Sequence, residues 1–231
     1  MAKRRGATNI RLTITTSGKV RVGLPNWSPY AAGVAFVRSR SDWVLKQLAL
    51  HEPPKLEEGA LVGKAHRLHF QYKPGAGTVT ARIAASQITV SSSLPPSEER
   101  VQIKARVACE RALRSEAEHL LPQRLDQLAK KCDYAYKGVR IRKLTSRWGS
   151  CSNAGIITLS YYLMQLPWRL IDYVLLHELV HTKHLHHGAD FWQAMNRAIP
   201  EAKKRQKEIR AHRPRVEVAK TDPGAILLLH N

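Results

Sequence analysis

Hydrophobic residues near the start of the chain alternate with polar ones, a pattern typical of β-strands. The alternation covers residues 10–24 and is interrupted at Ser17-Gly18, so it predicts a β-hairpin. Ser28-Pro29 then offers a helix N-cap followed by a proline at the first helical position. We expect one helix from there to about Leu50, before Pro53-Pro54 breaks the chain. The apolar face of that helix is expected to carry Val34, Val37, Trp43, Val44, Leu45 and Leu48.

Four short alternating segments follow and predict a meander of strands. They cover residues 60–62, 65–72, 78–83 and 87–91. His66 and His69 lie in the second segment, where a strand period of about two residues places them on opposite faces. We therefore interpret these histidines as surface or core residues and not as ligands.

A long helix is expected to begin at Ser97, with two glutamates in its first turn, where they suit the helix dipole. Pro122 should kink or divide it. Its buried side is expected to carry Ile103, Val107, Leu113, Leu120, Leu121, Leu125 and Leu128.

The last third of the chain predicts two strands and three helices. The strands cover residues 139–144 and 156–159, and the helices open at Pro167, near Ala189 and at Glu201. A strand placed just before the first of these helices could pair with an extended substrate through its exposed edge. The expected fold class is α+β, with three parts. These are a β-rich N-terminal region with one helix (residues 1–95), a helical domain with a small sheet (residues 96–213) and an irregular tail (residues 214–231).

The chain has 231 residues, and its 43% hydrophobic content is ordinary for a globular protein. No apolar run approaches the ~18 residues needed to span a membrane. The basic N-terminus lacks the apolar region of a secretory signal. Three widely spaced cysteines, Cys109, Cys132 and Cys151, suggest reduced thiols and a cytoplasmic protein.

The formal net charge is +20, and acidic residues are absent from three stretches. None precedes Asp42, none lies between Glu58 and Glu98, and none lies between Asp133 and Asp172. An uncompensated positive field attracts anions, so a nucleotide, a nucleic acid or an acidic peptide is a possible partner. The charge could equally serve solubility or loose RNA association.

The candidate chemistry centres on His177, Glu178 and His181. Two histidines four residues apart lie on one face of a helix, where both imidazoles can reach one metal ion. Glu178 lies beside them and can exchange a proton. A helix with two histidines that bind nothing is the alternative interpretation.

A catalytic zinc usually takes three protein ligands and a water, so one ligand remains to be found. On a straight helix, His184 would lie about 10 Å along the axis from His177, too far to share one ion. The chain must therefore turn back, and Gly188 can take the dihedral angles that such a turn requires. We favour His187, which adjoins it. The other candidates, in order, are His186, Asp190, and a carboxylate from the next helix, Glu201 or Glu208.

The expected mechanism is hydrolysis by a zinc-activated water, with Glu178 as the general base. The developing oxyanion would need a further donor, for which Arg147, Tyr161, Tyr162 and His184 are candidates. The residues that we select as candidates for substrate binding are Arg147, Trp148, Tyr161 and Tyr162.

Several segments together resemble the YgjP-like metallopeptidases, which are relatives of the SprT-like zincins. They are residues 146–152 (SRWGSCS), residues 155–159 (GIITL), and the HExxH sequence followed by a histidine six residues later. The first half of the chain also looks similar, so the resemblance covers most of the sequence. It implies a zincin-like fold in the second domain, zinc ligation by His177, His181 and His187, and Glu178 as the catalytic base.

A zinc-dependent metallopeptidase that acts on polypeptides is therefore the leading hypothesis. A metal-dependent nucleoside triphosphate (UTP) pyrophosphatase is the first alternative, supported by the acid-free basic segment before the metal helix. A nucleic-acid-associated protein whose zinc is structural is the second alternative. The sequence makes no prediction of the oligomeric state.

Overall fold

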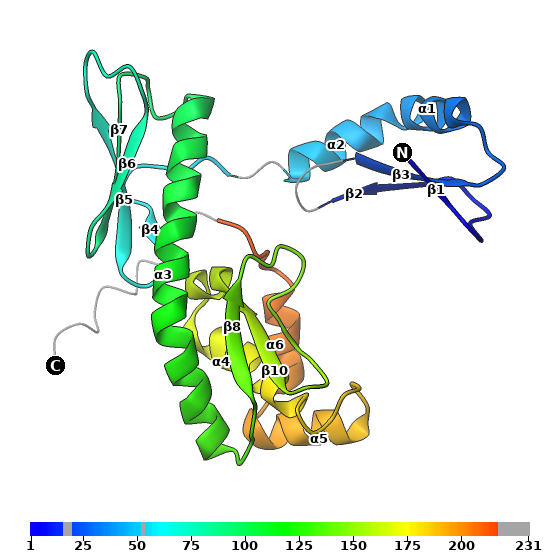
Figure 1. The fold of residues 1–231 in the computed structure, drawn as a ribbon, viewed down its shortest axis with the longest axis vertical. Helices are drawn as coiled ribbons and strands as arrows, with labels where there is room; N and C mark the ends of the chain where they lie inside the picture. Colours follow the sequence, from blue (N-terminus) through cyan, green and yellow to red (C-terminus); the bar gives the residue numbers. More distant parts are fainter. Residues whose placement is uncertain (16–19, 52–53, 217–231) are drawn as a thin grey trace. The chain divides into compact units, whose positions relative to one another are not determined.

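The computed structural model describes residues 1–15, 20–51 and 54–216, and the chain forms two compact units (Figure 1). The first unit is Met1–Pro53 and the second is Pro54–Asn231. The expected α+β class is confirmed, because helices and small sheets occur in both units. The division falls after Pro53 and not after residue 95, because the strands between residues 61 and 92 pack on a helix of the second unit.

The first unit contains a three-stranded sheet and two helices. Strands β1 (Ala2–Arg4), β3 (Val20–Pro25) and β2 (Arg11–Ile14) lie in the order β1-β3-β2. The β2–β3 pair is the expected antiparallel hairpin, although its turn, Ser17-Gly18, lies outside the described residues. β1 adds to the other edge in parallel and was not predicted.

The helix that we expected over residues 29–50 is present as two helices, α1 (Tyr30–Ser39) and α2 (Ser41–His51), which are separated at Arg40. Val44 is buried as predicted, whereas Trp43 and Leu45 are 44% and 63% exposed. Val34 is also exposed. A small sheet offers these short helices only a narrow apolar contact, so part of their apolar surface stays in solvent.

The second unit begins with a four-stranded sheet. Its strands are β4 (Leu61–Val62), β5 (His66–Tyr72), β6 (Thr80–Ile83) and β7 (Gln87–Ser92). The sheet order is β4-β5-β7-β6, and β5 and β7 are parallel. The prediction of a meander was therefore wrong in its pairing, because β6 lies at the edge and not between its neighbours in sequence. One face of this sheet is buried, and it carries Leu68, Ile88 and Val90.

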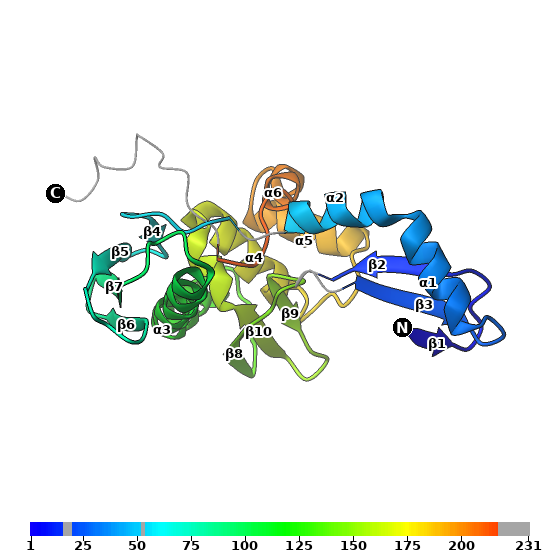
Figure 2. The same cartoon turned by 90° about the horizontal axis from the view of Figure 1, so that it is seen from above.

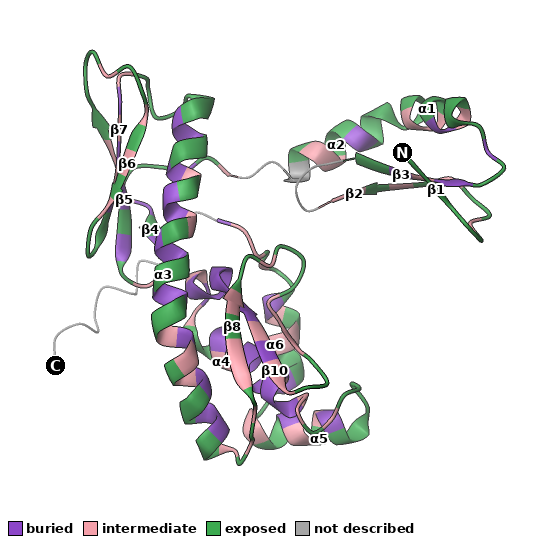
Figure 3. Ribbon diagram, viewed as in Figure 1, coloured by how far each residue is buried: buried purple, intermediate pink, exposed green. Residues whose placement is uncertain are grey.

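The long helix α3 (Glu99–Lys131) runs between the two sheets of the second unit (Figures 1 and 2). Its N-cap is Glu98, one residue after the expected Ser97, and Pro122 lies inside the helix without dividing it. Ile103 and Val107 were wrongly assigned to its buried side, since they are 55% and 51% exposed. The buried stripe visible in Figure 3 consists of leucines and small residues: Ala105, Ala108, Cys109, Ala112, Leu113, Ala117, Leu121, Leu125 and Leu128. Small residues let neighbouring elements approach the helix closely.

Glu116 on α3 fixes the loop between β4 and β5. Its carboxylate accepts hydrogen bonds from the backbone N–H groups of Lys64 (2.7 Å) and Ala65 (3.1 Å). It also bonds His66 Nδ1 at 2.6 Å, and both side chains are buried. Gly63 lies so close, with φ +67°, that an added Cβ atom would stand 2.1 Å from Glu116 Oε2. His66 thus has a structural partner, as expected for a residue that binds no metal.

The second sheet of this unit has the order β8-β10-β9, formed by Gly138–Arg142, Ile156–Ser160 and Gly149–Cys151. β10 pairs in parallel with β8 and antiparallel with β9. β10 is the strand before the helix that carries His177 and His181, and it is central in the sheet, so it is not the free edge that we expected. The edge strand in contact with that helix is β9, which the sequence pattern did not predict.

Four further elements complete the second unit: η1 (Tyr161–Gln165), α4 (Trp168–Val180), α5 (Ala189–Ala198) and α6 (Ala202–Ile209). α4 is mostly buried, as its apolar sequence predicts. No helix among the described residues is long and apolar enough to cross a membrane. All three cysteines are unpaired, and burial raises the pKa of the Cys109 thiol to about 12. Most of the expected C-terminal tail, from residue 217 on, lies outside the described residues.

Candidate metal centre

Three histidine side chains converge at the end of α4. His177 lies in its last turn, His181 is the C-cap, and His187 lies in the loop before α5. His177 Nε2 is 3.2 Å from His181 Nε2 and 3.1 Å from His187 Nε2. Three nitrogen atoms that share a tetrahedral zinc at about 2.0–2.1 Å would be about 3.3 Å apart. The spacing therefore fits the binding of one metal ion.

The loop after α4 reverses the chain and brings His187 back. The backbone N–H of His184 donates to Val180 O, and the carbonyl of His184 lies 3.0 Å from His181 Nδ1. If Nδ1 donates to that carbonyl, Nε2 is left unprotonated and its lone pair is available to a metal. His184 thus contributes its backbone, and its side chain is not part of the cluster.

The ring of Phe191, on α5, packs against all three histidine rings. Its centroid lies 5.0 Å from that of His177, 4.8 Å from that of His181 and 4.6 Å from that of His187. Phe191 is fully buried. Burial lowers the pKa of His177 to about 3, with smaller contributions from His181 and His187. The neutral imidazole, which is the form that binds metal, is therefore favoured.

Glu178 is buried beside the histidines, with 4% of its surface exposed. Its Oε2 atom and His177 Nδ1 have no hydrogen-bond partner among the described residues. Burial raises the pKa of the Glu178 carboxyl to about 8, and the positive charge of Arg147 opposes this shift. A buried carboxyl oxygen without a partner is costly unless something polar completes the site. A metal ion with a water would do so.

Strand β9 lies against Glu178 at Gly149. An added Cβ atom there would stand 2.7 Å from Glu178 Oε1 and 2.9 Å from its Cγ atom. Cys151 on the same strand also lies close enough for Glu178 to raise the pKa of its thiol, after the larger effect of burial. Gly149 is a site residue that sequence reasoning missed. The only hint of it in the sequence was that residues 146–152, which precede the strand predicted at residues 156–159, contain this glycine.

The four residues selected for substrate binding have different surroundings. Arg147 is exposed and near enough to Glu178 to affect its pKa. Trp148 is half-buried and packs on the hydrophobic core. Tyr161 and Tyr162 are buried, and the Tyr162 hydroxyl bonds Glu110 on α3 at 2.6 Å. These contacts give the two tyrosines a packing role and do not bring them to the histidines.

The remaining candidate ligands are not part of the histidine cluster. His186 and Asp190 are exposed and lie outside it. Glu201 pairs with Lys204, and Glu208 bridges Arg169 and Arg205. Among the described residues, His177, His181 and His187 are the group of histidine, cysteine or acidic side chains that could hold a metal. The donor set, its spacing and the buried Glu178 oxygen fit a zinc ion.

Comparison with known proteins gives a family match and similarities to solved structures. Residues 8–212 match the family described as YgjP-like, metallopeptidase domain. No curated protein matches the chain. A metallopeptidase zymogen of Pyrococcus abyssi, abylysin, is 28% identical and covers 43% of this chain and all of its own, with a TM-score of 0.38. Another, jannalysin of Methanocaldococcus jannaschii, is 17% identical and covers 39% of this chain and 94% of its own, with a TM-score of 0.36.

The family match spans most of the chain, so this protein belongs to the YgjP-like metallopeptidase family. The resemblance seen in the sequence is confirmed. Membership supports a hydrolase of the peptidase type with a divalent metal ion.

Proposed function

We propose that this protein is a zinc-dependent peptidase in which His177, His181 and His187 hold the metal and Glu178 is the catalytic base. The observation that carries the proposal is the convergence of three imidazole nitrogens beside a buried carboxylate. The family match supports the peptidase class. We also propose a cytoplasmic location, supported by the three unpaired cysteines.

The zinc would act as a Lewis acid that activates a water and polarises the substrate carbonyl. Glu178 accepts the proton of the attacking water at Oε2, its unpartnered oxygen. It then holds this proton and returns it to the leaving amine. Burial raises the pKa of this carboxyl in the metal-free protein, and the positive charge of a bound metal ion would lower it again, so that the carboxylate is free to accept a proton.

An extended polypeptide fits the surroundings of the site. Within its sheet, β9 pairs on one side only, with β10. The backbone groups of its other edge can hydrogen-bond an added strand, which places a peptide next to Glu178. The absence of a side chain at Gly149 lets this edge approach the carboxylate. Arg147 is exposed and precedes β9 by two residues. It is the candidate donor of hydrogen bonds to the developing oxyanion.

The test is activity profiling of the purified protein, metal-free and after zinc addition, on a denatured protein library. We expect new peptide termini only after zinc is added. A parallel arm with UTP and pyrophosphate detection tests nucleotide hydrolysis, the alternative that the basic charge suggested. Zinc-dependent pyrophosphate release without peptide cleavage would overturn the proposal in favour of a pyrophosphatase.

A further inference from the structure

The sheet of the first unit has one covered face and one open face. Leu24 on β3 points toward α1, because a Cβ atom added to Gly33 of that helix would lie 2.9 Å from Leu24 Cδ2. Side chains alternate along a strand, so Arg21 and Gly23 belong to the opposite face. α1 and α2, the described helices of the first unit, both lie on the side of Leu24 (Figure 1), so no described helix of this unit packs on the opposite face.

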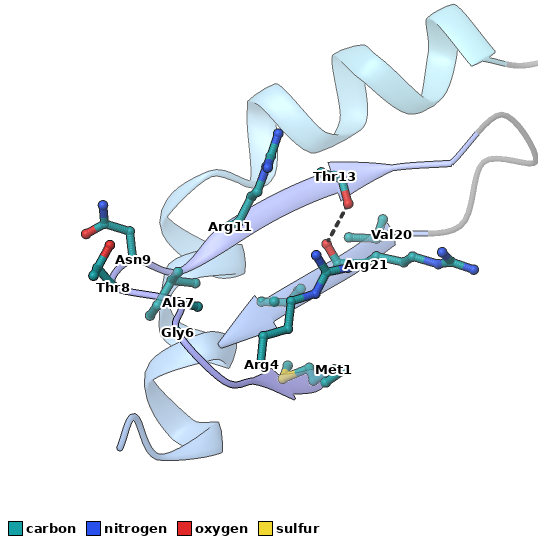
Figure 4. A pocket seen from close by; sticks show the side chains of 14 residues that line it. Met1, Arg4, Gly6, Ala7, Thr8, Asn9, Arg11, Thr13, Val20 and Arg21 are labelled. Atoms are coloured by element: carbon teal, nitrogen blue, oxygen red, sulfur yellow. Dashed lines mark hydrogen bonds between the residues drawn. The ribbon is translucent and has the colours of Figure 1, made fainter. Parts of the chain in front are cut away.

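Three arginines gather on the open face, one from each strand. Arg11 on β2 pairs in register with Gly23, so its side chain lies on the same side of the sheet. The Cδ and Nε atoms of Arg4, on β1, lie 3.8 Å from where a Gly23 Cβ atom would stand. With Arg21 they line a groove of about 700 Å³ (Figure 4).

The charge of this groove is uncompensated. No ion pair involves Arg4, Arg11 or Arg21 among the described residues, and the sequence has no acidic residue before Asp42. Arg4 is level with Pro25, four residues along β3 from Arg21. At about 3.3 Å per residue their Cα atoms lie about 13 Å apart, and the Arg4 side chain reaches back along β3 as far as Gly23. Three uncompensated cations that line one groove suit a ligand with several anionic groups.

An exposed tryptophan lies in the turn that follows β3. Trp27, which is 77% exposed, follows β3 by two residues, at the end where Arg4 is located. The Lys3 ammonium fixes the connecting loop by donating to Asn26 O at 2.9 Å. Bases of a single strand stack on such aromatic rings, whereas those of a duplex are already stacked on one another.

We propose that this open face binds single-stranded nucleic acid, with Arg4, Arg11 and Arg21 as phosphate contacts and Trp27 as a stacking platform. The residues of this site belong to the first unit and the three histidines to the second, and the proposal does not depend on the proposed peptidase activity. The test is fluorescence anisotropy of the full-length protein with labelled 12-nucleotide oligo-U RNA and oligo-T DNA. Affinity is measured over a range of salt concentrations.

Replacing the three arginines with glutamine should weaken binding at least about 10-fold. It should reduce the slope of log affinity against log salt by about 2, at ~0.7 for each phosphate that is no longer neutralised. Trp27→Ala should weaken binding about 5- to 150-fold, because one stacked base is worth about 1–3 kcal/mol. Tighter binding of RNA or of DNA would identify the natural strand, and either result supports the site.

The matched control replaces Lys73, Arg82 and Lys104 with glutamine. These exposed residues belong to the second unit, and their replacement lowers the net charge equally. It should change affinity less than 3-fold, and Glu178→Gln should change it not at all. Equal weakening by the control would overturn the site in favour of diffuse charge attraction. Unchanged affinity of Trp27→Ala would overturn it as well. So would duplex DNA or polyglutamate that displaces the labelled strand more strongly than unlabelled oligo-U does.

Discussion

Gly149 and Glu178 are in direct contact, so close that a Cβ atom on Gly149 would lie 2.7 Å from the Glu178 carboxylate. The edge strand β9 therefore rests on the proposed catalytic base, and the two positions cannot be changed independently. A methyl group at residue 149 must push either the strand or the carboxylate away. Because a displacement of about 1 Å can cost about 100-fold in rate, the contact should matter for catalysis.

Gly149→Ala should lower kcat about 100-fold while the protein still binds one zinc ion, because the histidines are not touched. The overpacking should also lower the free energy of unfolding by about 1–3 kcal/mol. Peptide hydrolysis and metal analysis check the first expectation, and urea unfolding checks the second. Gly138→Ala is the control in the same sheet, since a Cβ atom there meets nothing within 4 Å. Equal effects of the two substitutions would argue against the role of the contact.

His187→Ala should weaken zinc binding more than about 100-fold, because even residues that merely support a ligand contribute 10- to 100-fold. Competition with a chelating dye measures the affinity. His186→Ala is the control, since it removes an exposed histidine that lies outside the cluster. A larger loss of affinity for His186→Ala would mean that the third ligand is misassigned.

The metal-free protein should show a stability that depends on Glu178 and pH. Its carboxyl has a pKa of about 8 when folded, against an ordinary 4.5, so the folded state retains the proton more strongly. The contribution of this carboxyl to the free energy of unfolding is fully present below pH 4.5, and it is lost as the pH rises through 8. At about 1.4 kcal/mol per pKa unit, the upper bound is about 5 kcal/mol.

Glu178→Gln should therefore stabilise the metal-free protein above pH 8 and have little effect near pH 4. The lowered pKa of His177 acts in the opposite direction, since its contribution is lost as the pH falls below 6.5. It is present in both proteins and cancels in their difference. Urea unfolding of both proteins from pH 4.5 to 9 measures that difference, and a gap that does not widen with pH would refute the expectation.

Glu116→Ala should lower the free energy of unfolding by about 3 kcal/mol, because buried donors of the β4–β5 loop would lose their common acceptor. Glu118→Ala is the control on the same helix. It removes an exposed ion pair with Arg114, and such pairs contribute little to stability because solvent screens them. Similar destabilisation by both substitutions would show that the loop does not depend on Glu116.

The sequence predicted the helical part of the site because helix geometry relates His177 and His181 directly. It could not identify β9, whose three residues, Gly149–Cys151, show no hydrophobic alternation. The contact of Gly149 with Glu178 joins residues that are distant in sequence, so no local pattern reveals it.

The apolar faces were predicted less well than the elements. Ile103 and Val107 were assigned to the core of α3, but the structure buries Ala105, Ala108 and Cys109 instead. Close approach of neighbouring elements favours small side chains, and a pattern of large apolar residues gives them too little weight. Tyr161 was selected as a candidate for substrate binding, and the structure buries its side chain in the core, which the sequence pattern did not predict.

The central claim is that Glu178 moves the proton for a zinc ion held by the three histidines. It is tested most directly by peptide turnover of the zinc-loaded Glu178→Gln variant, with zinc content measured on the same sample. We predict one zinc per chain and a kcat reduced about 100- to 10,000-fold, the range for loss of a general base. A variant that holds its zinc and cleaves peptides as fast as the wild type would contradict the claim.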